Sequence, residues 1–207
     1  MRDGPAAFID DLTLLAEHAV HPIVVAPTPD CAQQIVRAIN RSANVAVSLR
    51  GSDAAFLPQT ANGIGRVHTP LLDTLIAAGY IPVVEPTAFT LFGERDAEVV
   101  ADDVASAIGA ACAAARAIFF HRAGGVIDPR TQALIVELTP AEALALADDP
   151  LVDDALRSTM RAAARGVRGG IPAAQIVDGR VAHATVVELL TAQHLGTQVA
   201  GGVILAA

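Results

Sequence analysis

Apolar and polar residues alternate along this chain with two different periods, and the alternation predicts helices and short strands in turn. Apolar residues recur every three or four positions from Ala6 to Ala19, which is typical of a helix with one buried face. His21-Pro22 ends this helix, because the residue before a proline disfavours helical dihedral angles. The apolar run from Ile23 to Ala26 predicts a strand. The pattern then repeats, with a helix from Asp30 and a strand over Asn44–Leu49.

The middle of the chain carries the strongest element signals. Thr69-Pro70 predicts a helix start, with a hydroxyl N-cap and proline at the first helical position. A buried strand over Tyr80–Glu85 leads through an irregular arm to an alanine-rich helix that starts near Val99, and a strand follows over Ala117–His121. We also expect irregular backbone over the glycine-punctuated residues 61–67. Farther on, the same criteria predict strands over 133–138, 173–177 and 197–205, and helices over 141–147, 152–165 and 185–193.

Strands and helices therefore alternate along nearly the whole chain. This order predicts an α/β fold, a three-layer sandwich in which a mostly parallel central sheet is flanked by helices. We expect one domain over residues 1–207. Because 53% of the residues are hydrophobic and only 3% are aromatic, its core must consist of Ala, Val, Ile and Leu.

Charge excludes one large class of function. The net charge is −8 and no cluster of basic residues exists, which argues against nucleic-acid binding. All 14 basic residues are arginine, and the sequence contains no lysine. Arg157, Arg161, Arg165 and Arg168 recur every three or four positions, so they share one helix face. This face is either a solvated surface or a row that binds an anion.

Targeting signals and thiols point to the cytosol. The N-terminus has acidic residues where a signal peptide needs an apolar run, and no apolar stretch is long enough to span a membrane. We therefore expect a cytoplasmic protein without membrane contact. Cys31 and Cys112 lie inside apolar helical patterns, which predicts buried free thiols. The histidines lack metal-ligand spacing, so we predict no metal site.

Four stretches, in this order, carry a family resemblance. They are AVSLRGSD, which ends at Asp53; GYIPVVEP, residues 79–86; VADDVA, residues 100–105; and GGIPAAQIVDGRVAHATVVELLTAQHLGT, residues 169–197. The sequence resembles the amino-acid kinase family and, within it, the acetylglutamate kinases. The resemblance implies a fold in which ATP, with magnesium, gives its γ-phosphate to a carboxylate of acetylglutamate, a step of arginine biosynthesis. Such transfer depends mostly on positioning and on neutralising charge.

The resemblance also assigns nucleotide-site residues. Asp102 matches the aspartate that holds two phosphate-binding lysines in that family, although a carboxylate in the first turn of a helix is also favoured by the helix dipole alone. The second of those lysines aligns with Thr159, and a shift of two residues offers Arg161 instead. The family's nucleotide segment aligns with residues that include His121 and Arg122.

The substrate side departs further from the family pattern. Ala26-Pro27-Thr28-Pro29 stands where the family has a glycine loop, and proline has no N–H to offer a phosphate. Thr28, Gly51 and Ser52 are the substrate-binding candidates. Glu98 aligns with a substrate-contacting asparagine, and a carboxylate there would repel an acidic substrate. We expect the domain to lack the family's first strand, the lysine on that strand and the glycine loop.

Three functional hypotheses follow. The preferred one is an acetylglutamate kinase-like protein without phosphoryl transfer, which binds a small amino-acid-like metabolite or acts as a regulatory subunit beside a paralogous kinase. The second is an active kinase, in which Arg122, Arg157, Arg161 and a metal held by Asp102 or Asp103 neutralise the phosphate charge. The third is a scaffold for oligomerisation, in which the alanine-rich helix packs against its own copy in a homodimer.

Overall fold

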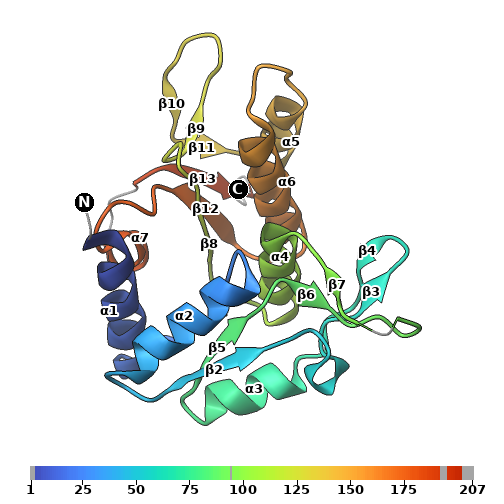
Figure 1. Ribbon diagram of the computed structural model, residues 1–207. Helices are drawn as coiled ribbons and strands as arrows, with labels where there is room; N and C mark the ends of the chain where they lie inside the picture. Colours follow the sequence, from blue (N-terminus) through green and yellow to red (C-terminus); the bar gives the residue numbers. More distant parts are fainter. Residues whose placement is uncertain (1–2, 94, 192–194, 202–207) are drawn as a thin grey trace, which may run out of the picture.

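Seven helices and two main sheets make up the part of the chain that the computed structural model describes, residues 3–93, 95–191 and 195–201 (Figure 1). The helices are α1 (Asp3–Glu17), α2 (Pro29–Asn40), α3 (Pro70–Ala77), α4 (Ala101–Ala111), α5 (Pro140–Ala147), α6 (Asp154–Arg168) and α7 (Ala184–Leu190). Their order along the chain follows the predicted one. The predicted helix over 185–193 ends at Leu190, and residues 192–194 lie outside the described part.

The first sheet is entirely parallel. Its order is β1 (Val24–Val25), β5 (Ile81–Val84) and β2 (Ala46–Leu49). Val24 pairs with Val83 on one side of β5, and Ala46 pairs with Ile81 on the other. All three strands therefore end at the same edge of this sheet.

The second sheet is mixed. Its order is β11 (Glu137–Leu138), β13 (Thr197–Ala200), β12 (Ala173–Val177) and β8 (Ala117–Phe120). The β12–β8 and β11–β13 pairs are parallel, and the β12–β13 pair is antiparallel. The expected α/β architecture with mostly parallel pairing is thus confirmed, although hydrogen bonding divides the strands between two sheets rather than joining them in one.

Helices cover both faces of the first sheet. Successive residues of a strand point to opposite faces, so neighbouring residues of β5 pack against different helices. On β5, Val83 packs in a core with Leu12 of α1 and Ile39 of α2. Val84 packs in a different core, which includes Leu72 of α3 and residues of α4. A third core joins the second sheet to α5 and α6. These layers form the predicted sandwich.

Three segments predicted as irregular or as one strand form hairpins instead. The glycine-punctuated stretch contains β4 (Gly63–Ile64), which pairs with β3 (Gln59–Thr60) just before it. The arm contains β6 (Thr87–Ala88) and β7 (Ala97–Glu98). The strand expected over 133–138 is split, since β10 (Leu134–Ile135) pairs with β9 (Val126–Ile127) while β11 joins the second sheet. Short antiparallel pairs of this kind have too few residues for an alternating pattern to reveal them.

The predicted N-cap hydrogen bond is present at the start of α5 and absent at the start of α3. At α5 the Thr139 hydroxyl accepts a hydrogen bond from the Glu142 N–H, and the Glu142 carboxylate accepts one from the Thr139 N–H, which lowers the pKa of Glu142. At α3 the helix begins at Pro70 as predicted, but the Thr69 side chain makes no capping bond because Thr69 already has helical dihedral angles.

Composition-based expectations were only partly right. Both cysteines are free, as expected, but each is only half-buried, so the prediction of fully buried thiols is wrong. Burial, followed by the charge of Asp73, raises the pKa of the Cys112 thiol. In the described part of the chain no group of His, Cys, Asp or Glu is arranged to hold a metal ion, and no helix there is long and apolar enough to cross a bilayer.

Candidate functional site

The carboxyl edge of the first sheet gathers several of the predicted site residues. Three parallel strands end there, and α/β proteins bind ligands at such edges. Thr28 follows β1, Glu85 follows β5, and the segment Arg50-Gly51-Ser52 follows β2. Because β5 is the central strand, Glu85 lies between the other two loops.

Glu85 is a buried carboxylate with two neighbours from β2 and its following loop. Its relative exposure is 4%. The Ser48 hydroxyl donates to Oε1 at 3.2 Å, and Nε of Arg50 lies 3.3 Å from Oε2. The Arg50 side chain is 62% exposed, against 5% for that of Glu85. A buried carboxylate thus forms an ion pair with an arginine whose side chain is mostly exposed to solvent.

The arm packs against the loop that follows β2. The Gly51 N–H donates to Thr87 Oγ1 at 3.3 Å, and a Cβ on Gly51 would lie 2.4 Å from the Thr87 carbonyl oxygen, so only glycine fits there. The Ser52 hydroxyl donates to Asp96 at 2.7 Å. Glu98 pairs with Thr87 across the hairpin. The structure therefore brings Gly51, Ser52 and Glu98 together.

Thr28, at the same edge of the sheet, stabilises the start of a helix. It is the N-cap of α2, and its hydroxyl accepts a hydrogen bond from the Cys31 N–H at 3.2 Å. This bond satisfies one of the backbone donors that have no partner inside the helix. Pro29 follows at the first helical position. The segment Ala26-Pro27-Thr28-Pro29, which stands where the family has a glycine loop, thus leads into the start of α2.

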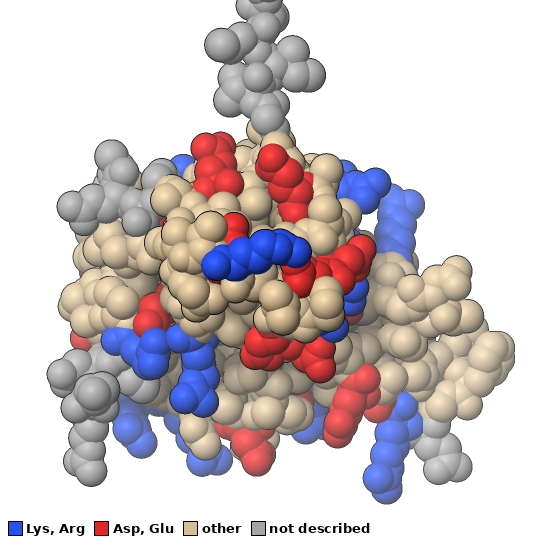
Figure 2. Space-filling model, turned by 90° about the horizontal axis from the view of Figure 1, so that it is seen from above, with Lys and Arg blue, Asp and Glu red and all other residues tan. Residues whose placement is uncertain are grey.

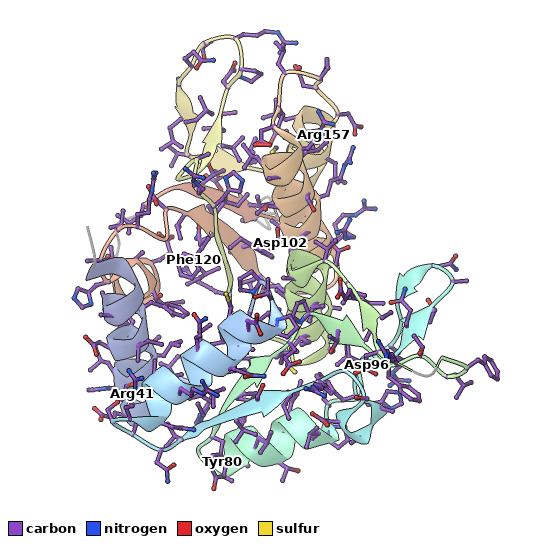
Figure 3. All side chains as sticks on the ribbon, viewed as in Figure 1. Arg41, Tyr80, Asp96, Asp102, Phe120 and Arg157 are labelled. Atoms are coloured by element: carbon purple, nitrogen blue, oxygen red, sulfur yellow. The ribbon has the colours of Figure 1, made fainter. Side chains whose placement is uncertain are left out.

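Asp102 lies in the first turn of α4, where α4 meets α6 (Figure 3). The Thr159 hydroxyl of α6 donates to Asp102 Oδ2 at 2.6 Å. Asp103 forms an ion pair with Arg165, and the Ser106 hydroxyl donates to the Ala162 carbonyl at 2.6 Å. Asp102 and Thr159, two candidates for the nucleotide site, are therefore joined by a hydroxyl–carboxylate hydrogen bond at a polar contact between the two helices.

Arg161 lies apart from Thr159 although only two residues separate them, since two residues turn a helix by about 200°. Its guanidinium pairs with Asp148 at the end of α5, at 2.6 Å. Arg157 pairs with Asp154 at 2.8 Å. Three members of the arginine row thus face carboxylates of the same chain. Figure 2 shows, on the face seen from above, basic side chains interspersed with acidic ones rather than forming a continuous field.

His121 and Arg122 follow β8 on the second sheet. The Ala123 N–H donates to Nδ1 of His121 at 3.1 Å, and the Arg122 carbonyl accepts from Arg180 at 2.8 Å. Arg180 also binds Asp178, and that side-chain hydrogen bond is the main reason why the pKa of Asp178 is lowered. Among the described residues no hydrogen bond or ion pair joins His121 or Arg122 to Asp102.

Sequence reasoning did not single out the Arg50–Glu85 pair or Asp96. A usable signal existed for Glu85, because a carboxylate directly after an apolar strand such as IPVV must be paired if it is buried. Arg50 comes directly after β2, the strand that pairs with β5, just as Glu85 comes directly after β5. Asp96 gave no signal, since its position depends on the hairpin.

Comparisons with known proteins agree with this architecture. Residues 14–178 match the model of the amino acid kinase family. The chain is 31% identical over 208 residues to the acetylglutamate kinase of Parasynechococcus marenigrum (strain WH8102), which covers 95% of this chain and 71% of that protein. It is 34% identical over 180 residues to the acetylglutamate kinase of Synechococcus sp. (strain WH7803), with 82% of this chain and 61% of that protein covered.

Solved structures show the same fold at lower identity. N-acetylglutamate synthase from Neisseria gonorrhoeae, complexed with coenzyme A and N-acetyl-glutamate, superposes with a TM-score of 0.78 at 18% identity, covering 97% of this chain and 56% of that one. An isopentenyl phosphate kinase superposes with a TM-score of 0.62 at 18% identity, covering 81% and 64%. The chain belongs to the amino-acid kinase family and, within it, is similar to the acetylglutamate kinases.

Proposed function

We propose that this protein is an acetylglutamate kinase-like member of its family that binds a small amino-acid-like metabolite without transferring phosphate. It would act as a regulatory or partner subunit in amino-acid metabolism of the arginine type. The observation that carries this proposal is the environment of Asp102. Its partner on α6 is the neutral hydroxyl of Thr159, at 2.6 Å, where the resemblance implies a lysine.

Phosphoryl transfer requires compact positive charge around the moving phosphate. The sequence has no lysine to supply it. Arginine is planar and less compact, so it is not an equivalent clamp. Removing one well-placed electrostatic clamp costs on the order of 3 kcal/mol of barrier, or roughly a hundredfold in rate. The loss of the lysine at the position of Thr159 would alone lower turnover by a factor of this order, which the Asp102 carboxylate cannot restore.

Three of the four arginines of α6 are already paired and do not offer a substitute. Arg157, Arg161 and Arg165 each pair with a carboxylate of the same chain. Releasing any of them to grip a phosphate would leave that carboxylate without its partner. Pro27 and Pro29 flank Thr28 where backbone N–H groups would approach a phosphate.

The alternative is an active kinase that acts on the carboxylate of an N-acylated amino acid. Its support is the 31% identity to an acetylglutamate kinase across 95% of this chain. In that case Asp102 would organise the site, and ATP with magnesium would be required. The two readings differ in turnover, so one assay separates them.

The deciding experiment measures ADP formation from ATP–magnesium in the presence of N-acetyl-L-glutamate. We expect no acceptor-dependent turnover above that of an Asp102→Asn variant, while calorimetry detects binding of a small metabolite. Acceptor-dependent turnover that disappears in Asp102→Asn would overturn the proposal. Sedimentation analysis of the same preparation tests the expected homodimer, and co-purification with an intact acetylglutamate kinase tests the partner role.

A further inference from the structure

Strand β1 forms one outer edge of the first sheet, whose order is β1-β5-β2. In a parallel pair, successive residues of a strand direct their N–H and C=O groups to opposite sides. The Ala26 N–H donates to the Val84 carbonyl of β5 at 3.0 Å, so the N–H and C=O of Val25 point away from β5. Neither of these two groups makes a hydrogen bond to a residue that the structure describes. β1 therefore presents an open backbone edge.

Strand β8 forms an outer edge of the second sheet in the same way. The His121 N–H donates to the Val177 carbonyl of β12 at 2.8 Å, so the alternate residues Ile118 and Phe120 direct their backbone groups outward. These outward groups have no hydrogen-bond partner in the described part of the chain. Both strands thus end their sheets with unpaired donors and acceptors, which is the arrangement that an added strand requires.

The same two helices cover both open edges. On one face, Phe8 of α1 packs against the core that contains β1, and its ring meets that of Phe120 on β8 with 5.5 Å between the ring centroids. On the other face, α4 packs on β1 and on β8. Val104 of α4 lies in one core with Val25, and Ala105 packs against the core of the second sheet. A strand placed between β1 and β8 would be covered on both faces, and strands of this kind are apolar throughout.

The opposite edges of both sheets are protected. At β2, Nδ2 of Asn40 donates to the Ala46 carbonyl at 2.9 Å, and Oδ1 of Asn40 accepts from the Ala46 N–H at 2.7 Å. One side chain thus occupies both backbone groups of Ala46. At β11, Glu137 places an exposed charge on the edge. Covered backbone groups and charges protect sheet edges against strand addition. β1 and β8 consist of apolar residues and have no such protection among the described residues.

We propose that the β1 and β8 edges together bind an extended apolar segment of another protein, which inserts as a strand and joins the two sheets into one. The open N–H and C=O groups require an extended backbone, and the two covering helices require apolar side chains on both faces. A second copy of this chain is a poor donor, because its apolar interior strands β5, β12 and β13 are already paired on both sides. The inference goes beyond the proposed function, since strand insertion is independent of phosphate transfer.

The probe is the peptide Arg-Val-Ile-Val-Ile-Val-Arg, amidated and labelled with fluorescein at its N-terminus. Its apolar stretch of about five residues has the length of an average strand. Titration with the whole chain, followed by fluorescence anisotropy, should show saturable binding. Replacing the central Val by Pro removes an N–H that an interior strand needs and should weaken binding about tenfold or more. Replacing it by Asp places a charge beneath a covering helix and should weaken binding at least as much.

Hydrogen exchange followed by NMR connects binding to the proposed edges. In the free protein the amides of Val25, Ile118 and Phe120 should exchange rapidly, because they have no hydrogen-bond partner among the described residues. Saturation with the peptide should slow their exchange about tenfold or more. The Ala46 amide, which is already bonded to Asn40, should not change.

A matched pair of proline variants tests the protein side of the contact. Ile118→Pro removes an N–H that points away from β12, so it leaves the pairing of β8 with β12 intact and should weaken peptide binding about tenfold. Glu137→Pro removes the corresponding outward N–H from β11, at the far edge of the same sheet, and should leave peptide binding unchanged.

The inference is wrong if the peptide does not bind, if the Val and Pro peptides bind equally, or if binding leaves exchange at Val25, Ile118 and Phe120 unchanged. Slow exchange at all three amides in the free protein also contradicts it, because the edges would then already be covered, and a dimer in sedimentation analysis would assign them to a second copy. If Ile118→Pro does not fold, the peptides and the exchange data still decide. None of these results bears on ATP turnover, so the proposed function is tested separately.

Discussion

At the scale of single residues, the bond between Thr159 and Asp102 makes the sharpest prediction. Thr159 is buried and its hydroxyl donates to a carboxylate at 2.6 Å. Thr159→Val keeps the shape of the side chain and removes the donor. We expect the free energy of unfolding to fall by about 1–2 kcal/mol, because a hydrogen bond to a charged group is lost while Asp102 regains some water. Urea denaturation measures the change.

A matched control and a double variant test the assignment. Thr13→Val removes a hydroxyl whose hydrogen-bond partner in the described part of the chain is the Ile9 carbonyl of the same helix, at 3.0 Å, and should change stability little. Combining Thr159→Val with Asp102→Asn should cost less than the sum of the two single changes, since both break the same interaction. Strict additivity would show that Thr159 stabilises the protein through packing alone.

Asp178 supplies a residue-scale prediction about pH. The side-chain hydrogen bond from Arg180 is the main cause that lowers the pKa of Asp178 below its ordinary value. A carboxyl whose pKa is lowered by folding stabilises the fold above its unfolded pKa, about 3.9, and this stabilisation is lost as the pH falls through the folded pKa. Arg180→Gln should therefore lower the free energy of unfolding at about pH 6. Below about pH 4 the free energies of unfolding of the variant and the parent protein should become more similar.

Carboxyl chemical shifts check this directly. In Arg180→Gln the titration midpoint of Asp178 should rise toward that of an unperturbed aspartate. Arg66→Gln, which removes an exposed arginine from another loop, should leave that midpoint in place. A stability difference that stays constant down to pH 3, on the order of one unit below the ordinary pKa, would contradict the linkage.

At the scale of elements, α2 tests whether Thr28 serves the helix or a ligand. Its hydroxyl caps the helix through the Cys31 N–H. Thr28→Ala should lower the free energy of unfolding by about 1 kcal/mol, the usual cost of losing such a cap, and Thr28→Ser should restore most of it. Thermal and urea denaturation provide the measurement. Equal loss in both variants would assign the effect to the methyl group instead of the cap.

Elements also show what a sequence can and cannot predict. The helices and the strands at β5 and β12 were predictable because each has many apolar residues in one period and clear end signals, such as Thr139-Pro140 for α5. The hairpin of β6 and β7 was not, because each strand has two residues and its position depends on contacts with Gly51 and Ser52. Part of the candidate site lies on this hairpin, so the sequence did not predict the position of that part either.

At the scale of the whole molecule, the site depends on how strands from distant segments meet. The resemblance placed Gly51, Ser52 and Glu98 in one substrate region, and the structure brings them together. The resemblance leaves Arg161 as an alternative to Thr159, but helix geometry directs Arg161 to Asp148, directly after α5. Alignment transfers positions along the chain, whereas the direction of a side chain follows from the helix that carries it.

Helices α1 and α7, far apart in the sequence, are joined by a contact that no local sequence pattern reveals. Asp11 of α1 is 1% exposed, and its Oδ1 lies 2.7 Å from Nδ1 of His183 at the start of α7. Phe8 of α1 and Phe120 of β8 also pack edge to face, with 5.5 Å between their ring centroids. Helix α1, which packs on the first sheet through α2, is thereby also attached to the second sheet (Figure 1).

His183→Ala should therefore loosen the molecule at this contact. Among the described residues, the partner that remains for the buried Asp11 carboxylate is the Val186 N–H, at 3.4 Å. This long hydrogen bond predicts a loss of about 1–3 kcal/mol in the free energy of unfolding. Hydrogen exchange should speed up in α1 and α7 and stay unchanged in α5 and α6, whose core is separate. His18→Ala removes an exposed histidine whose ring, within the residues that the structure describes, bonds the Leu14 carbonyl of α1, and should alter exchange in neither region. If exchange in α1 stayed as slow as in the parent protein, α1 would be held by its apolar contacts alone, and the Asp11–His183 pair would contribute nothing to joining the two sheets.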